Sequence, residues 1–528
     1  MSAPRVDLVG LSPRELVDKQ VADRVASRLG AADPTLWGPD AEAEASIRLG
    51  WVRLHESSRP LLAEIEGLQA ELRAEGLDRI VLCGMGGSSL APEVITQTAG
   101  ADLTVLDTTD PGAVRRSLAD RLDRTVVVVS SKSGSTVETD SQRRAFEAAF
   151  QAAGIDAPTR MVAVTDPGSQ LAEHAEQAGW RRTFLADSSV GGRFSALTAF
   201  GLVPSGLAGA DVAALLDDAA AAADAVFLDD PANPALVLGA VMGAAHASGR
   251  HKLVIGEHDS GVLSFGAWAE QLIAESTGKL GRGVLPVDVG SVAATGWLGA
   301  GQDAVRVALG GPVEGVDEQV ATSGPLGGQL LLWEAATVVA GRMIGINPFD
   351  QPNVEDAKKA ARSMLDAPAA AEPDEPPTTD GAVEVHGPGA DAAGALSHLL
   401  DQVPEGGYLA VLAYLDPVAD ATAADLREVL GRRLGRQVTF GWGPRYLHST
   451  GQYHKGGHPD GAFLVLTGAV AEDLDVAGRP YTFGRLIAAQ SAGDAGVLAG
   501  QGLPVLRLHL TDRTAGLRQV LAAAEADR

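Results

Sequence analysis

Two apolar stretches of the chain each end in a cluster of glycines and hydroxyl side chains. The first runs from Ile80 into Gly84-Met85-Gly86-Gly87-Ser88-Ser89, and the second from Val126 into Ser130-Ser131-Lys132-Ser133-Gly134-Ser135-Thr136. A turn of this kind opening a helix leaves backbone N–H groups unpaired at the positive end of the helix dipole, and the hydroxyls add further donors. We therefore predict that the two loops together hold the phosphate of one small molecule, a sugar phosphate.

A dinucleotide site is the competing interpretation of the first loop. Gly84 and Gly86 follow a strand, and Asp107 ends the next apolar run, as in a dinucleotide fingerprint. However, Ser89 stands where the third glycine or alanine belongs, and a dinucleotide domain has no use for the hydroxyls and the lysine of the second loop. Neutral donors and one cation suit a terminal phosphate better. For each loop alone, a merely polar turn is the other alternative.

The elements around the loops must place them side by side. Short apolar strands alternate with amphipathic helices between residues 78 and 187, and we expect the strands near 79–83, 103–106, 125–130, 161–165 and 183–186. This alternation predicts a parallel sheet with helices on both faces, whose ligands bind at the carboxyl ends of the strands. Both loops occupy that edge.

The rest of the chain divides by composition and pattern. We expect an N-terminal helical lead-in (1–76), a first α/β domain with the loops (77–230), a second α/β domain (231–366), a proline-rich acidic linker (367–390) and a C-terminal α/β segment (391–528). The C-terminal segment is either independent or folded back onto the second domain.

Composition excludes several classes of function. The chain of 528 residues has a net charge of -26, which argues against nucleic acid or an anionic membrane surface as a partner. Its one cysteine, Cys83, excludes an internal disulfide and fits a reducing compartment. The N-terminus has no signal-like apolar segment, and no stretch is apolar enough to span a membrane. We expect a cytoplasmic protein.

Further motifs extend the pattern and carry a family resemblance. The two loops resemble those of sugar isomerase domains, and Val190-Gly191-Gly192-Arg193-Phe194-Ser195 resembles a signature of the glucose-6-phosphate isomerase family. The stretches 271–279 and 347–358 resemble the family's segments with the catalytic glutamate and with a binding glutamine and a lysine. The resemblance, from residue 80 to 360, implies an α/β fold with two flavodoxin-like parallel-sheet sugar isomerase domains, helices on both faces and a C-terminal α/β segment.

The resemblance implies an aldose-ketose isomerase of glycolysis and gluconeogenesis, interconverting glucose 6-phosphate and fructose 6-phosphate through a cis-enediol. Glu275 would move the proton between adjacent carbons, since one carboxylate can reach both. Arg193 would stabilise the enediolate, whose charge is present only near the transition state. Gln271, four residues before Glu275 on one helix face, and Gln351 would position the sugar. The phosphate would bind at Gly87, Ser88, Ser131, Lys132, Ser133, Gly134, Ser135 and Thr136, with Gly87 allowing a close approach.

Closed sugar rings must first be opened by an acid and a base. The resemblance implies Lys358 and His448, because Leu447-His448-Ser449-Thr450-Gly451-Gln452 matches a family stretch. In this chain the histidine follows Lys358, an order that resembles the isomerase portion of certain fused transaldolase and phosphoglucose isomerase chains. The spacing of His454 and His458 gives no helical ligand pair, so we expect no metal, and the chemistry needs no cofactor.

Two other functions remain open. One is an isomerase of the same fold that accepts mannose 6-phosphate or an amino sugar, which phosphate loops cannot distinguish. The other is a non-catalytic sugar-phosphate sensor, which predicts loss of the carboxylate or the arginine, and both positions are filled. A dinucleotide oxidoreductase is disfavoured by the second loop. A homodimer is implied by the resemblance alone.

Overall fold

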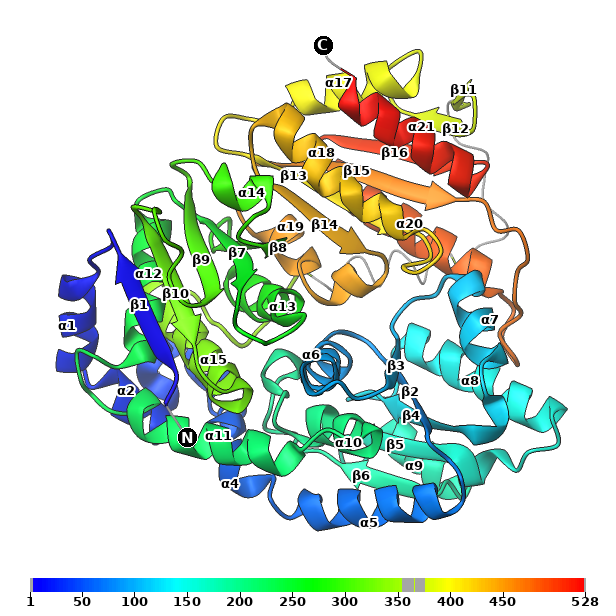
Figure 1. The fold of residues 1–528 in the computed structure, drawn as a ribbon, viewed down its shortest axis with the longest axis horizontal. Helices are drawn as coiled ribbons and strands as arrows, with labels where there is room; N and C mark the ends of the chain where they lie inside the picture. The colour runs from blue at the N-terminus through cyan, green and yellow to red at the C-terminus, as the bar shows by residue number, and fades with distance from the viewer. Residues whose placement is uncertain (1–2, 354–364, 366–375, 527–528) are drawn as a thin grey trace.

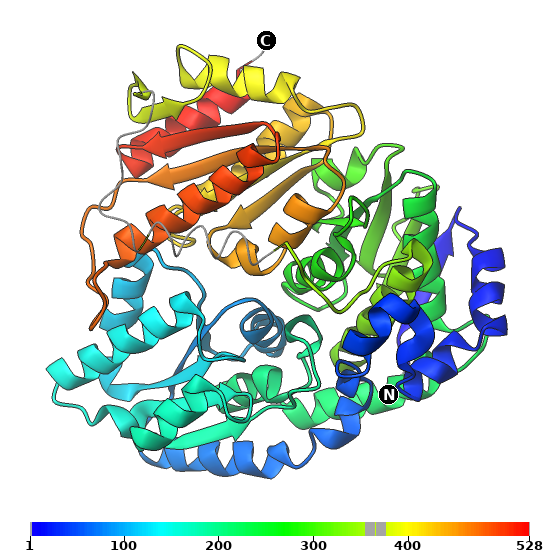
Figure 2. The same cartoon turned by 180° about the vertical axis from the view of Figure 1, so that it is seen from behind.

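The computed structural model describes residues 3–353, 365 and 376–526. Three sheets lie around a common centre, with helices α6, α13 and α19 between them (Figures 1 and 2). The predicted α/β class with parallel sheets is confirmed by the strand order and pairing. No described helix combines the length and apolarity needed to cross a membrane.

The first sheet has the order β3-β2-β4-β5-β6 and is parallel throughout. Its strands are β2 (Arg79–Gly84), β3 (Leu103–Leu106), β4 (Thr125–Ser130), β5 (Met161–Thr165) and β6 (Arg182–Leu185). The helices that follow or cover them are α5 (Leu61–Ala74), α6 (Leu90–Ala99), α7 (Pro111–Ala119), α8 (Val137–Ala152), α9 (Gln170–Gln177) and α10 (Ala199–Ala208).

Alternate residues of these strands enter different cores, which is why the strands are apolar throughout. Ile80 and Leu82 of β2 pack with α5, α6 and α10, whereas Val81 and Cys83 pack on the opposite face with α7, α8 and α9. Helices on both faces leave only the strand ends for a ligand.

The second sheet has the order β1-β10-β9-β7-β8. Strands β7 (Lys252–His258), β8 (Leu285–Ser291), β9 (Ala304–Gly310) and β10 (Gln319–Ser323) are parallel, and β1 (Arg5–Val9) is an antiparallel edge strand. Its helices are α11 (Val212–Val226), α12 (Pro234–Ala247), α13 (Phe265–Thr277), α14 (Thr295–Leu298) and α15 (Leu326–Ile344).

The N-terminal stretch, expected to be helical, therefore also supplies a strand to this distant sheet. In this strand, β1, the side chains from Arg5 to Leu8 alternate charged and apolar, which suits a half-exposed edge strand. Helices α1 (Arg14–Ala22), α2 (Val25–Gly30), α3 (Pro39–Ala45) and α4 (Leu54–Ser57) follow it. The domain boundaries themselves stay a prediction.

The C-terminal residues form a sheet of their own with the order β11-β12-β16-β15-β13-β14. Its strands are β11 (Thr378–Asp380), β12 (Val383–His386), β13 (Tyr408–Tyr414), β14 (Val438–Trp442), β15 (Gly461–Gly468) and β16 (Val505–Leu510). The pairs β11–β12 and β12–β16 are antiparallel, and the other three pairs are parallel. Its helices are α17 (Ala392–Asp401), α18 (Asp425–Leu434), α19 (Gly451–Gly456), α20 (Phe483–Gly500) and α21 (Arg513–Glu525).

This third sheet is docked onto both of the others. One of its faces shares a core with the second sheet, in which Leu412 and Tyr446 pack with Val287. Toward the first sheet, Arg116 makes two hydrogen bonds to Asp416, of 2.6 and 2.8 Å. The C-terminal segment is thus a separate sheet that is fixed against both of the other two.

Candidate active site

Both hydroxyl-rich loops open onto one pocket at the carboxyl edge of the first sheet. The first loop leaves β2 through a short 3₁₀ turn, Gly86–Ser88, before α6 begins, and the second leaves β4 and ends where α8 begins. The pocket has a volume of about 670 Å³. Its lining includes eleven of the residues singled out by sequence: Gly87, Ser88, Ser131, Lys132, Ser133, Ser135, Thr136, Gln271, Glu275, Gln351 and His448.

Two of the described residues among those predicted, Gly134 and Arg193, are not part of this lining. Gly134 lines a neighbouring pocket on the outer side of the second loop. Arg193 is buried behind the wall, with 3% of its side chain exposed. Lys358 lies outside the described residues.

The second loop is held in shape by its own hydroxyls. Gly134, with a φ of +73°, donates its N–H to Oγ of Ser131 at 3.1 Å, and the hydroxyls of Ser133 and Ser135 lie 2.8 Å apart. The ammonium of Lys132 donates to the carbonyl oxygen of Val190 at 2.5 Å. Burial lowers the pKa of Lys132. Lys132 therefore ties this loop to the stretch that carries Arg193.

The two adjacent glycines of the first loop allow close contact with the protein itself. A Cβ built on Gly87 would lie 2.0 Å from the carbonyl oxygen of Gly192. One on Gly86, whose φ is +56°, would lie 2.7 Å from both Nε2 of Gln271 and the carbonyl oxygen of His448. Only glycine fits there. These contacts bring the first loop close to the segment that carries Arg193 and to the segment that carries His448.

Glu275 and Arg193 form a buried ion pair at the pocket wall. Glu275 lies on α13 with 5% exposure, and Nη1 of Arg193 is 3.5 Å from its Oε2. Nε of Arg193 donates to Oγ of Ser276 at 2.8 Å, and Nη2 donates to the carbonyl oxygen of Pro348 at 2.6 Å. Burial lowers the pKa of the Arg193 guanidinium. The arginine is thereby fixed beside the carboxylate.

A second buried cation secures the segment that carries Gln351. Nζ of Lys279, one turn beyond Glu275, donates to the carbonyl oxygen of Asn347 at 2.8 Å and to Oδ1 of Asp350 at 2.7 Å. Burial, followed by repulsion from Arg193, lowers the pKa of Lys279 to about 8. Oε1 of Gln351 in turn accepts from Nη1 of Arg193 at 3.4 Å.

His448 faces the pocket from the third sheet. It ends the 3₁₀ turn Arg445–His448, and its neighbour Leu447 is packed in the core shared by the second and third sheets. Its Nε2 lies 3.1 Å from Oε1 of Glu138, in the first turn of α8, and its carbonyl oxygen accepts from Nε2 of Gln271 at 2.7 Å. Gln490 of α20 donates to the same Oε1 of Glu138 at 2.7 Å.

Sequence reasoning missed Glu138, Gln490 and Lys279. Glu138 follows the second loop directly, a local signal that is indistinguishable from an ordinary acidic residue in the first turn of a helix. Gln490 lies within an apolar helix and gives no local signal. Among the described residues, no group of three His, Cys, Asp or Glu side chains could hold a metal ion.

Comparisons with known proteins find similar sequences. The sequence model of the phosphoglucose isomerase family matches residues 67–301. Glucose-6-phosphate isomerase of Acaryochloris marina is 37% identical over 210 residues, which are 38% of this chain and 40% of the relative. Glucose-6-phosphate isomerase of Synechococcus elongatus is 30% identical over 351 residues, 54% of this chain and 66% of the relative. The chain thus spans about two fifths of the first relative's length.

Two solved structures share the fold. A hypothetical protein of Thermus thermophilus has a TM-score of 0.57 at 24% identity, over 69% of this chain and 100% of that one. A glucose-6-phosphate isomerase of Chlamydia trachomatis has a TM-score of 0.53 at 19% identity, over 67% of this chain and 84% of that one. Together with the sequence matches, they show that residues 67–301 resemble the phosphoglucose isomerase family and that the chain shares the fold of these two structures.

Proposed function

We propose that this protein interconverts glucose 6-phosphate and fructose 6-phosphate through a cis-enediol. One observation carries the proposal. The buried Glu275–Arg193 pair lies at the wall of the same pocket that the two hydroxyl-rich loops line. The pocket thus has a place for the phosphate, a base for the carbon-bound proton and a fixed cation for the charge that develops.

The proposed steps follow from these groups. The hydroxyls of Ser88, Ser131, Ser133, Ser135 and Thr136, with the loop N–H groups, anchor the phosphate. Glu275 takes the proton from one carbon and returns it to the neighbouring carbon. The guanidinium of Arg193 stabilises the enediolate oxygen, because it is already oriented and needs no reorganisation. Gln271 and Gln351 hold the sugar hydroxyls.

Ring opening is assigned to His448, with Lys358 as partner on the strength of the resemblance. Glu138 is a positioning residue, since its carboxylate accepts from the imidazole and fixes the ring toward the pocket. The proposal includes a preference for glucose 6-phosphate over mannose and amino-sugar phosphates. It also includes a homodimer, which rests on the family resemblance, and a cytoplasmic location, which rests on the single cysteine. The acidic composition disfavours nucleic acid.

A coupled assay tests the activity directly. Purified full-length protein supplied with fructose 6-phosphate, excess glucose-6-phosphate dehydrogenase and its nicotinamide cofactor is expected to reduce the cofactor. Mannose 6-phosphate supplied in place of fructose 6-phosphate tests the alternative substrate. A protein that binds fructose 6-phosphate in calorimetry but gives no reduction with any hexose phosphate would be a sensor, and the proposal would fail.

The contact between His448 and Glu138 leads to a prediction about ring opening. Glu138→Gln is expected to lower turnover of fructose 6-phosphate about 10- to 100-fold, the usual effect of losing an orienting partner, and His448→Ala at least as much. Neither change should much slow solvent-proton exchange into 5-deoxyfructose 6-phosphate, which lacks the hydroxyl that closes the ring. NMR in D₂O measures this exchange.

Glu173→Gln, which neutralises an exposed carboxylate on α9, is the control for Glu138→Gln and should behave as the parent in both reactions. If the Glu138 and His448 variants lost as much activity with 5-deoxyfructose 6-phosphate as with fructose 6-phosphate, these residues would act in proton transfer or in folding. Their proposed role in ring opening would then be wrong.

The lowered pKa of Lys279 leads us to expect that activity falls at alkaline pH. Since the folded pKa is about 8, the ammonium holds Asp350 below that pH and loses its charge above it. We expect kcat/KM for fructose 6-phosphate to fall as the pH rises through about 8. Lys279→Met should lower kcat/KM at pH 7 and abolish this alkaline limb. If the limb persists unchanged in Lys279→Met, another group causes it.

A further inference from the structure

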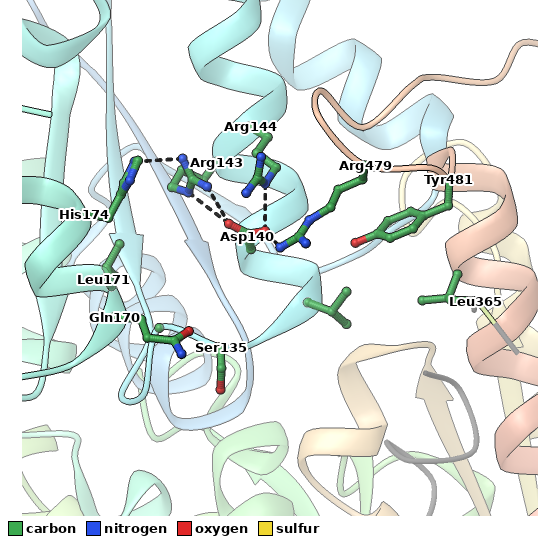
Figure 3. A pocket seen from close by; sticks show the side chains of 12 residues that line it. Ser135, Asp140, Arg143, Arg144, Gln170, Leu171, His174, Leu365, Arg479 and Tyr481 are labelled. Atoms are coloured by element: carbon green, nitrogen blue, oxygen red, sulfur yellow. Dashed lines mark hydrogen bonds and ion pairs between the residues drawn. The ribbon is translucent and has the colours of Figure 1, made fainter. Parts of the chain in front are cut away.

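A second pocket lies on the outer side of the phosphate loop and is built around arginines. It has a volume of about 520 Å³, and α8, the start of α9 and the loop before α20 supply its walls (Figure 3). Ser135 and Gln170 line both this pocket and the catalytic one. The two pockets are therefore separated by a single shared wall.

Three guanidinium groups in this pocket converge on one carboxylate. Figure 3 shows Arg143, Arg144 and Arg479 directed at Asp140, two from α8 and one from the C-terminal segment. The distances to the oxygens of Asp140 are 2.5, 2.8 and 2.7 Å, respectively. Burial alone would raise the pKa of Asp140, but these bonds hold it well below its usual range.

The negative charge present does not balance these cations. Besides Asp140, the described part of the chain gives this cluster one further carboxylate, Glu147, which pairs with Arg143 at 2.5 Å. Among the described residues, three guanidiniums therefore face two carboxylates, which leaves a surplus positive charge in a chain whose net charge is -26. His174, 3.0 Å from Nη1 of Arg143, adds no negative charge.

Donors also remain for a ligand. A guanidinium presents five N–H groups. Arg479 uses only Nη2, toward Asp140, and Arg144 uses Nε and Nη1, among the hydrogen bonds between described residues. Their side chains are 43% and 27% exposed, so the remaining donors reach solvent. The hydroxyl of Tyr481 lines the same pocket.

We propose that this arginine pocket binds a phosphorylated metabolite, at a site distinct from the catalytic one and beyond the isomerase activity. Planar guanidinium forks match phosphate oxygens in pairs, which is the chemistry these donors offer. An occupant places a second anion beside the wall that carries Ser135. It therefore weakens binding of the substrate phosphate by repulsion, and by reciprocity the substrate weakens its binding.

Pyrophosphate is the probe, because it is compact and carries no sugar. The full-length protein is titrated calorimetrically while fructose 6-phosphate fills the catalytic pocket, and we expect one pyrophosphate to bind per chain. In the double variant Arg144→Gln/Arg479→Gln we expect binding at least about tenfold weaker. Arg14→Gln removes an 83% exposed arginine on α1 and is the matched control, expected to bind as the parent does.

A kinetic measurement tests the coupling. Pyrophosphate is expected to raise the KM for fructose 6-phosphate in the parent in two ways, by competition at the catalytic pocket and by repulsion from the arginine pocket. The double variant keeps only the first effect, so pyrophosphate should raise its KM less. Without pyrophosphate, the double variant should keep parental kcat and melting temperature. Absence of the calorimetric event in the parent, or parental affinity in the double variant, would overturn the proposal. The calorimetric titrations of the parent and of the double variant require no turnover, so failure of the isomerase activity is recognised separately.

Discussion

Replacing Glu275 by glutamine is expected to lower kcat for fructose 6-phosphate by about a thousandfold, within the range that general acid–base catalysis contributes. The amide has the shape of the carboxylate, but it cannot accept a proton from carbon and return it. Because the side chain keeps its volume and a hydrogen-bonding oxygen for Arg193, we expect KM and the melting temperature to stay near those of the parent. The coupled assay measures kcat and KM, and thermal unfolding measures the melting temperature.

Glu270 provides the control on the same helix. It is also buried, and its Oε1 accepts the N–H of Asp288 at 2.9 Å. Burial, followed by repulsion from Asp288, raises the pKa of Glu270 to about 8, so the side chain is largely neutral at pH 7. Glu270→Gln should therefore leave kcat almost unchanged. Near-parental turnover in Glu275→Gln would show that another group moves the proton.

The second large effect is expected at Arg193. Arg193→Lys should lower kcat/KM by about 100- to 1,000-fold, the usual loss when a preorganised donor to a developing oxyanion is removed. The guanidinium uses all three nitrogens, toward Ser276, Glu275 and the carbonyl oxygen of Pro348. A lysine has one nitrogen and cannot replace this fork. Steady-state kinetics measure the loss.

A lower melting temperature is also expected for Arg193→Lys, because the segment around Pro348 loses its donor. Arg181→Lys is the control. Arg181 makes two hydrogen bonds to the half-exposed Glu75, and a surface ion pair of this kind contributes little to stability. Parental kcat/KM in Arg193→Lys would exclude a role for the guanidinium in stabilising charge.

Local pattern accounts for what the sequence predicted. The strands expected near 79–83 and 125–130 are β2 and β4 within a residue, because a buried parallel strand is a continuous apolar run followed by a turn. Each hydroxyl-rich loop joins one strand to the next helix, so its position at the sheet edge follows from its neighbours in the sequence.

Packing between distant segments accounts for what the sequence could not predict. Strand β1 pairs with β10, and only the complete second sheet offers that edge. Likewise, Glu138 meets His448 because the third sheet docks on the first, which no periodicity records. The antiparallel pairing of β12 with the distant β16 has the same origin. A pattern in the chain reports which side of an element is buried, but not by what.

The pairing of His448 with Glu138 has a consequence for the newly made protein. These two residues are 310 positions apart, and Gln490 is 352 positions from Glu138. Domains generally fold in the order in which they leave the ribosome. A chain emerging with only its first sheet complete therefore has both hydroxyl-rich loops but not His448, to which we assign ring opening. Under the proposed function, such a nascent chain would bind sugar phosphate before it could convert any, and conversion of the closed sugar would begin only once the third sheet, which carries His448, is in place.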